Sequence, residues 1–325
     1  MVEIKNTHNA ETSSVFKLQT LNEVINSTKG KTAPDPIFGD FGFQNEIILL
    51  GGSTNVGKSI LAMDIAISNA TGINHFGKPM STGKKKVLYI DTELNDYQFT
   101  SRYQGCKTGK NLIRASFWEM MYGRTSTETF IEELEKLLYK KSRPELVILD
   151  NLCTICESMN SPKAVTHFLH EMKRIKETYQ ITLIIVSHFK KVTIGSPLTD
   201  DLFRGTGMLT AMSDTIIAVG NSALGADTKY LKLLKTRMVR KPDTVSVLDI
   251  SDEKYLHFEY VEDADEMDIL PQKNKRGPKS SLSDLEEELI WRLYEQGLSL
   301  RGIEQQTGIS KSSVQRHLKS HIQTS

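Results

Sequence analysis

The chain has 325 residues, of which 38% are hydrophobic and 25% charged, a composition typical of a folded protein with a sizeable core. Its formal net charge of +1 excludes a global attraction to nucleic acid, so any such binding must come from local basic patches. No apolar run approaches the roughly 18–20 residues of a membrane helix, and the first residues contain no apolar signal region. The three cysteines cannot all be paired, so we expect a cytoplasmic protein in a reducing compartment.

Short apolar runs alternate with segments of helical periodicity along the first two thirds of the chain. A short helix is expected within 16–25, and Phe38, Phe41 and Phe43 are expected to cover the edge of the core rather than stack on a base. Strands are expected at 46–50, 87–91, 145–150 and 181–188, within 111–118, and at 213–219, 230–236 and 244–250. Longer helices are expected at 126–140 and 161–179. This order predicts an α/β fold with a mostly parallel sheet flanked by helices.

A glycine-rich stretch follows the first strand and precedes a segment of helical spacing. The Walker A pattern G-x-x-x-x-G-K-[ST] is matched in full by Gly52, Ser53, Thr54, Asn55, Val56, Gly57, Lys58 and Ser59. The two glycines let backbone N–H groups approach phosphate oxygens, and the following helix adds its positive dipole end. Lys58 would reach the β- and γ-phosphates, and the Ser59 hydroxyl would hold Mg²⁺. The stretch therefore predicts a site for ATP and Mg²⁺.

Two acids follow predicted strands of the same sheet. Asp150 ends an apolar strand downstream of the glycine-rich stretch, where a Walker B acid would hold a Mg²⁺-bound water. The next residue is Asn151, whereas many ATPases place a water-activating glutamate beside the Walker B acid. We therefore expect the base to be Glu93, which follows the strand at 87–91; the alternative is that Glu93 only caps a helix.

These motifs, in this order, resemble those of the RecA-like ATPases over roughly residues 15–260. The matching features are the Walker A loop, the strand before Glu93, the strand that ends in Asp150, and a strand that ends in Ser187-His188. The resemblance implies that ATP lies at subunit interfaces and that His188 senses its γ-phosphate. It also implies that the loop after His188 faces single-stranded DNA.

The loop at 190–207 carries the residues that would make this DNA contact. Lys190, Lys191 and Arg204 would neutralise backbone phosphates without reading sequence. Phe189 and Phe203 are the only candidates for stacking on bases. The alternative is an ordinary solvated surface loop.

A further pair of residues resembles the Lys-x-Arg of the ring-forming replicative helicases. Lys235 and Arg237 follow a late strand, and the resemblance implies that they reach the ATP of a neighbouring subunit; exposed strand charges are the alternative. Within that class the chain is most similar to the plasmid RepA-type hexameric helicases, because its Walker A strand begins near Glu46. The DnaB-type helicases carry a separate domain before that strand.

Two cysteines and two histidines after the Walker B strand partly match a zinc pattern. Cys153 and Cys156 are followed by His167 and His170, with intervals shorter than those of the usual zinc finger. We therefore favour buried thiols over a zinc site.

The composition changes near Val261, where acidic residues are followed by a basic stretch with two prolines. We expect a RecA-like ATPase domain at 1–262, a linker at 263–281 and a helical domain at 282–325. The last domain resembles a helix-turn-helix, with an apolar face at positions 285, 289, 290 and 293 and a turn at Gly308. That resemblance implies duplex DNA binding by the third helix, through Lys311, Ser312, Ser313, Gln315, Arg316 and Lys319. A protein-interaction domain is the alternative.

Together these features predict an ATP-hydrolysing, ring-forming DNA helicase or translocase, expected to be hexameric, that acts in replication of a plasmid, phage or mobile element. Single-stranded DNA would pass through a central channel, and the helix-turn-helix would bind duplex DNA. One alternative is a RecA-like recombination or loading ATPase that assembles on DNA without unwinding it. The other is a DNA-binding regulator that ATP switches between oligomeric states.

Overall fold

The computed structural model describes residues 16–74, 83–116, 126–139, 143–155, 160–205, 207–271, 284–309 and 311–322. The chain divides into two compact units, one that ends at Pro271 and one that begins at Gln272.

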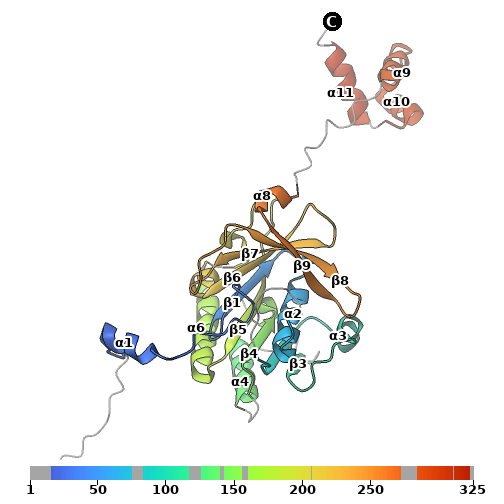
Figure 1. Cartoon of the computed structure of the whole chain (residues 1–325). Coiled ribbons are helices and arrows are strands. Elements are labelled where there is room, and N and C mark those ends of the chain that lie inside the picture. The colour runs from blue at the N-terminus through green and yellow to red at the C-terminus, as the bar shows by residue number, and fades with distance from the viewer. Residues whose placement is uncertain are drawn as a thin grey trace, which may run out of the picture. The chain divides into compact units, whose positions relative to one another are not determined.

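A nine-stranded sheet forms the centre of the described part of the first unit, with strand order β3-β2-β4-β5-β1-β6-β7-β8-β9 (Figure 1). The parallel strands are β1 (Ile47–Gly52), β2 (Val87–Asp91), β3 (Leu112–Ser116), β4 (Leu146–Asp150), β5 (Thr182–His188) and β6 (Thr215–Asn221). The antiparallel strands are β7 (Thr228–Lys235), β8 (Val245–Ser251) and β9 (His257–Ala264). The mostly parallel sheet confirms the predicted fold class.

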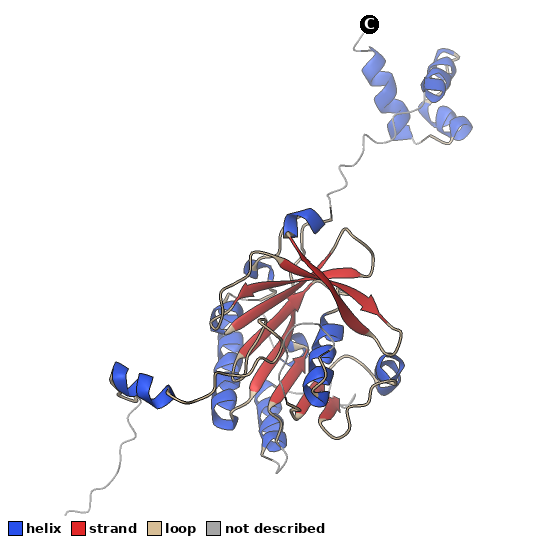
Figure 2. Ribbon diagram, viewed as in Figure 1, coloured by secondary structure: helices blue, strands red, loops and turns tan. Residues whose placement is uncertain are grey.

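Helices cover both faces of this sheet (Figure 2). α2 (Lys58–Thr71) packs on the face that carries Ile48 and Leu50. α4 (Thr127–Leu138) and α6 (Pro162–Tyr179) pack on the face that carries Ile47 and Leu49. Because successive side chains of a strand point to opposite faces, each central strand needs apolar residues throughout. Shorter helices lie in the connections: α3 (Asp96–Tyr103), α5 (Leu152–Ile155), α7 (Met208–Met212) and α8 (Glu266–Ile269).

The N-terminal helix α1 (Leu21–Thr28) confirms the helix expected within 16–25. A capping box starts it: the Thr20 hydroxyl accepts from the Glu23 N–H at 3.2 Å, and the Glu23 carboxylate accepts from the Thr20 N–H. None of its residues is buried, and Leu18 and Leu21 are 90% and 75% exposed. Its apolar face therefore has no cover within the described chain. By contrast, Phe38 and Phe41 are buried, as expected of core residues.

The end of the first unit differs from the expected boundary at 262. β9 continues to Ala264, α8 follows it, and the unit extends to Pro271. The acidic segment expected to begin the linker is therefore part of the first unit. The sequence pattern that indicates β9 is the alternation of apolar and polar residues around Phe258, which is fully buried, and Tyr260, which packs against the same core.

The second unit contains α9 (Asp284–Glu295), α10 (Leu300–Thr307) and α11 (Lys311–Ile322). Its small core consists of Ile290, Leu293, Ile303, Val314 and Leu318. Gly308 ends α10 with a φ of 70°, in the left-handed region that glycine adopts readily. Leu289 was expected on the buried face but is 41% exposed, because so small a core buries only a narrow stripe of α9. Among the described residues, no helix has both the length and the apolar character to span a membrane.

Candidate nucleotide site

The Walker A loop joins β1 to α2 and surrounds the amino group of Lys58. Lys58 Nζ donates a hydrogen bond to the Ser53 carbonyl at 2.7 Å, and the residue is buried. Gly57 precedes α2 with a φ of 99°, and a Cβ at this position would lie 2.6 Å from the ring of Phe258. Burial lowers the pKa of Lys58, and the carboxylates of Asp150 and Glu93 oppose that shift. The loop therefore has the backbone and the cation that a phosphate group requires.

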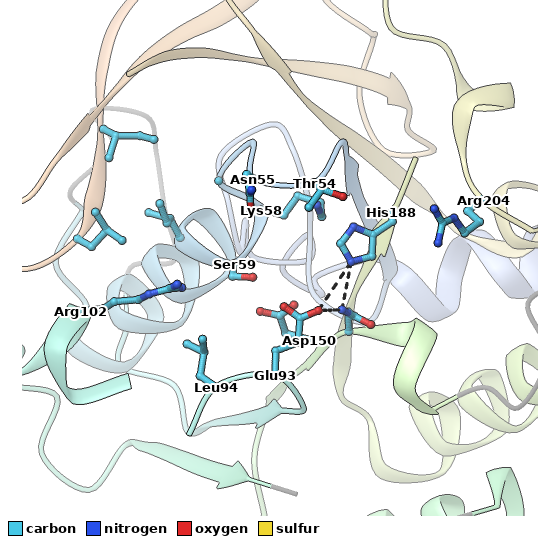
Figure 3. Close-up of a pocket in the computed structure, with 15 residues that line it drawn as sticks. Thr54, Asn55, Lys58, Ser59, Glu93, Leu94, Arg102, Asp150, His188 and Arg204 are labelled. Atoms are coloured by element: carbon cyan, nitrogen blue, oxygen red, sulfur yellow. Dashed lines mark hydrogen bonds and ion pairs between the residues drawn. The ribbon is translucent and has the colours of Figure 1, made fainter. Parts of the chain in front are cut away.

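A pocket of about 490 Å³ opens beside this loop (Figure 3). One part of its lining is polar and charged: Lys58, Ser59, Glu93, Asp150, Asn151, His188 and Arg204. The lining also includes a second group, which comprises Leu94, Arg102, Ile250 and Leu256. Figure 3 shows Leu94 and Arg102 at a distance from His188 and Arg204. No motif in the sequence predicts this second group. Leu94 and Arg102 follow Glu93 closely, whereas Ile250 and Leu256 approach only through the folding of β8 and β9.

Asp150 lies at the end of β4 among hydrogen-bond donors. Tyr89 Oη donates to Asp150 Oδ2 at 2.6 Å, and the Ser59 hydroxyl also bonds to the carboxylate. Burial raises the pKa of Asp150 to about 6, although both hydrogen bonds act in the opposite direction. Among the described residues, no cluster of three or more His, Cys, Asp or Glu side chains could hold a metal. The Ser59–Asp150 pair suits Mg²⁺, which takes oxygen ligands and is usually shared with nucleotide phosphates.

Glu93 and His188 approach each other at the ends of β2 and β5, with Asn151 between them (Figure 3). Asn151 Nδ2 donates a short hydrogen bond to Glu93 Oε1 and lies 3.2 Å from His188 Nε2. His188 Nε2 is 3.8 Å from Glu93 Oε1, and hydrogen bonding with His188 lowers the pKa of Glu93. The cap of α3 is Asn95, so Glu93 does not cap that helix. The result is a partly exposed carboxylate that is ionised at neutral pH.

The loop that follows β5 begins at this pocket. Arg204 lines the pocket, and its N–H donates to the His188 carbonyl at 2.9 Å. Phe189 and Phe203 are each 4% exposed and form an edge-to-face pair with ring centroids 4.9 Å apart. They pack against Gly51, where a Cβ would overlap both rings. These two rings, the only candidates for stacking on bases, therefore belong to the core and are not available to a base.

Lys235 and Arg237 do not line this pocket in their own chain. Lys235 Nζ donates to the carbonyls at the end of α7, namely those of Thr210, Ala211 and Ser213, at 2.7–3.1 Å. Arg237 Nη1 lies 2.9 Å from Asp214 Oδ1, and the Arg237 side chain is 59% exposed. β7 ends at Lys235, so Lys235 is the last residue of the strand and Arg237 lies beyond it. Arg237 is the one that another molecule can reach.

The remaining predicted DNA contacts are distributed over both units. Lys190 and Lys191 are exposed in the loop, and Lys311 and Gln315 are exposed on α11. Ser313 is half-buried, whereas the side chains of Ser312, Arg316 and Lys319 lie outside the described part. Cys153 is a free, half-buried thiol, and Cys156 lies outside the described residues.

Comparison with known proteins assigns this architecture to a family. Residues 12–193, more than half of the chain, match the AAA domain family. The chain is 26% identical over 207 residues to the DNA repair protein RadA of Campylobacter jejuni, a match that covers 62% of this chain and 39% of that protein. The chain thus spans about two fifths of the length of this relative.

The fold is also similar to that of a solved structure. A KaiC-like protein of the hyperthermophilic archaeon Pyrococcus horikoshii OT3 superposes with a TM-score of 0.51 at 13% identity, covering 71% of this chain and 98% of that one. The likeness at this identity concerns the fold alone. With its Walker A loop, its parallel sheet and its family match, this chain belongs to the AAA domain family and has the RecA-like fold of a P-loop ATPase.

Proposed function

We propose that this protein hydrolyses ATP to translocate along DNA as a ring-forming helicase or translocase. The observation that carries the proposal is the pocket in which the Walker A loop, Glu93, Asp150 and His188 meet. The polar part of the pocket contains the Lys58 cation and the backbone N–H groups of the Walker A loop, which would bind the phosphates. The second part, with Leu94 and Ile250, offers apolar surface for a nucleoside.

In the proposed hydrolysis each polar residue of the pocket has a task. Glu93 accepts the proton of the attacking water, because its carboxylate is ionised and partly exposed. Asn151 orients that carboxylate, and Lys58 neutralises charge on the transferred phosphoryl group. Ser59 and Asp150 would hold Mg²⁺, which supplies further positive charge to the phosphates when it is bound. His188 contacts the same carboxylate, so a change at the γ-phosphate reaches the loop that begins after it.

Two features support assembly into a multimer. The described residues leave the apolar face of α1 uncovered, with Leu18 and Leu21 largely exposed, and a second copy of the chain would bury it. Arg237 is exposed away from the pocket of its own chain, where it is free to approach a neighbour. A head-to-tail contact of this kind closes into a ring or continues as a filament.

A second candidate function is a recombination or loading ATPase that assembles on DNA without unwinding it. The similarity to a protein named for DNA repair favours this candidate. The pocket chemistry is the same in both cases, so the two candidates differ in what hydrolysis drives.

The test measures ATP hydrolysis with and without single-stranded DNA, and strand separation on a forked duplex. We expect stimulation by single strands and ATP-dependent unwinding; Lys58→Ala should abolish both because it removes the phosphate-binding cation. Glu93→Gln should bind nucleotide but lose turnover, because an amide does not accept the proton. Stimulation by single strands with neither unwinding nor movement along the strand would favour the second candidate. A rate of ATP hydrolysis that single-stranded DNA does not change would overturn both candidate functions.

A further inference from the structure

Arg204 is a cation of the nucleotide pocket, although the sequence places it in the loop expected to contact DNA. It is exposed, and Figure 3 shows it on the His188 side of the pocket, away from Leu94 and Arg102. We propose that Arg204 binds the γ-phosphate of the ATP held by its own chain and thereby sets the conformation of the 190–207 loop. This inference rests on the proposed ATP site.

The backbone around Arg204 is fixed to the end of β5. The Lys190 N–H donates to the Leu202 carbonyl at 2.6 Å, and the Arg204 N–H donates to the His188 carbonyl at 2.9 Å. Between these bonds lies the bridge that joins Phe189 to Phe203, whose rings pack together in the core. Arg204 therefore keeps its distance to His188, and hence to the phosphate end of the pocket.

The charge of Arg204 is uncompensated. Among the described residues, no carboxylate forms an ion pair with its guanidinium, whereas Arg114, Arg174 and Arg237 each have one. The guanidinium also acts on Cys153, which lies two residues after Asn151. Burial raises the pKa of the Cys153 thiol, and the positive charge of Arg204 lowers it. An unpaired guanidinium in a phosphate pocket can donate two hydrogen bonds to a terminal phosphate, and ADP lacks that group.

The same loop is anchored a second time, at Leu198. The Leu198 N–H donates to Glu266 Oε1 at 2.9 Å, and Lys232 Nζ donates to the Leu198 carbonyl at 2.9 Å. Lys232 and Glu266 also form a close ion pair with each other. Lys190, which belongs to the first anchor, and Lys191 beside it are both exposed. A contact between Arg204 and the γ-phosphate would therefore act on the segment that carries these two lysines.

The experiment compares binding of ADP and of the slowly hydrolysed analogue ATPγS to the full chain without DNA. We expect Arg204→Ala to weaken ATPγS binding by roughly 10-fold or more while ADP binding changes less than about twofold, since only the analogue carries a γ-phosphate. Arg204→Lys should recover part of the loss. The matched control is Arg143→Ala, an exposed arginine that does not line the pocket and should change neither affinity.

A second readout follows the loop itself. ATPγS should slow hydrogen exchange over 190–207 in the unmodified protein and should fail to do so in Arg204→Ala. Equal weakening of both nucleotides, or intact ATPγS binding combined with lost single-strand binding, would overturn the inference and return Arg204 to a structural or DNA-contacting role. If the unmodified protein bound neither nucleotide, the proposed ATP site would fail instead.

Discussion

Asp150 is a buried carboxylate whose proton affinity depends on folding. Its pKa rises from 3.8 to about 6 on burial, while Tyr89 supplies a hydrogen bond at 2.6 Å. The folded protein therefore holds this proton more tightly than the unfolded chain does. Between about pH 4 and pH 6 the native state binds more protons, so this residue makes stability fall as pH rises through that window. Above it, the nucleotide-free protein bears the full cost of a buried charge that the hydrogen bonds from Tyr89 and Ser59 offset only in part.

Asp150→Asn should therefore stabilise the nucleotide-free protein at pH 7 by roughly 2–3 kcal/mol, because the amide is neutral at every pH. The gain should shrink towards pH 4, where Asp150 itself is protonated. Urea unfolding of both proteins at several pH values measures the difference. Adding Mg²⁺ and ATP should make the unmodified protein the more stable of the two, because the bound cation offsets the charge of the Asp150 carboxylate and has no such effect on the neutral amide.

Glu93→Gln is the matched control for that series, because Glu93 is half-exposed and its pKa is lowered rather than raised. Glu93→Gln should not increase the free energy of unfolding at pH 7. A wild-type protein as stable as Asp150→Asn at pH 7 would contradict the assigned cost of burying Asp150.

Individual elements differ in how well the sequence predicts them. The β1–loop–α2 segment is predicted in full, because Gly57, Lys58 and the apolar runs on both sides of them determine its structure locally. Phe189 and Phe203 could not be assigned to the core from sequence, because their burial depends on Gly51 of a different strand. Arg204 was assigned to DNA for the same reason: only the bridge between β5 and the segment before Arg204 brings it to the pocket.

The three C-terminal helices α9, α10 and α11 have a core of their own, so their removal should not disturb the nucleotide pocket. A chain that ends at Pro271 should keep its basal ATPase activity and lose any preference for a duplex sequence.

Arg316→Ala in the full chain should weaken binding to the preferred duplex site by roughly 1–3 kcal/mol if this residue reads a base. Arg292→Ala is the control, because Arg292 is exposed on α9 rather than α11. Unchanged duplex preference after truncation would exclude α11 as a recognition helix.

At the scale of the whole molecule, two cations of the predicted set, Lys235 and Arg237, lie away from the nucleotide pocket of their own chain. Lys235 is occupied by the carbonyls at the end of α7, and burial lowers its pKa. Arg237 is paired with Asp214, yet more than half of its side chain is exposed. Lys235 is therefore fixed within its own chain, whereas the Arg237 guanidinium is exposed and held by an ion pair with Asp214. An exposed arginine that can exchange such a partner for a phosphate is suited to act on the ATP of a neighbouring chain, where such a residue raises hydrolysis by orders of magnitude.

Mixing two inactive variants tests this arrangement. Arg237→Ala lacks the cation donated to the neighbour, and Lys58→Ala lacks the phosphate-binding cation, so each should be inactive alone. In mixed assemblies some interfaces pair an intact Walker A loop with an intact Arg237, so ATPase activity should partly return. Arg240→Ala, which removes an exposed arginine from the same segment, should remain active alone. No recovery on mixing, full activity of Arg237→Ala, or full activity in a monomer would show that Arg237 does not act between chains.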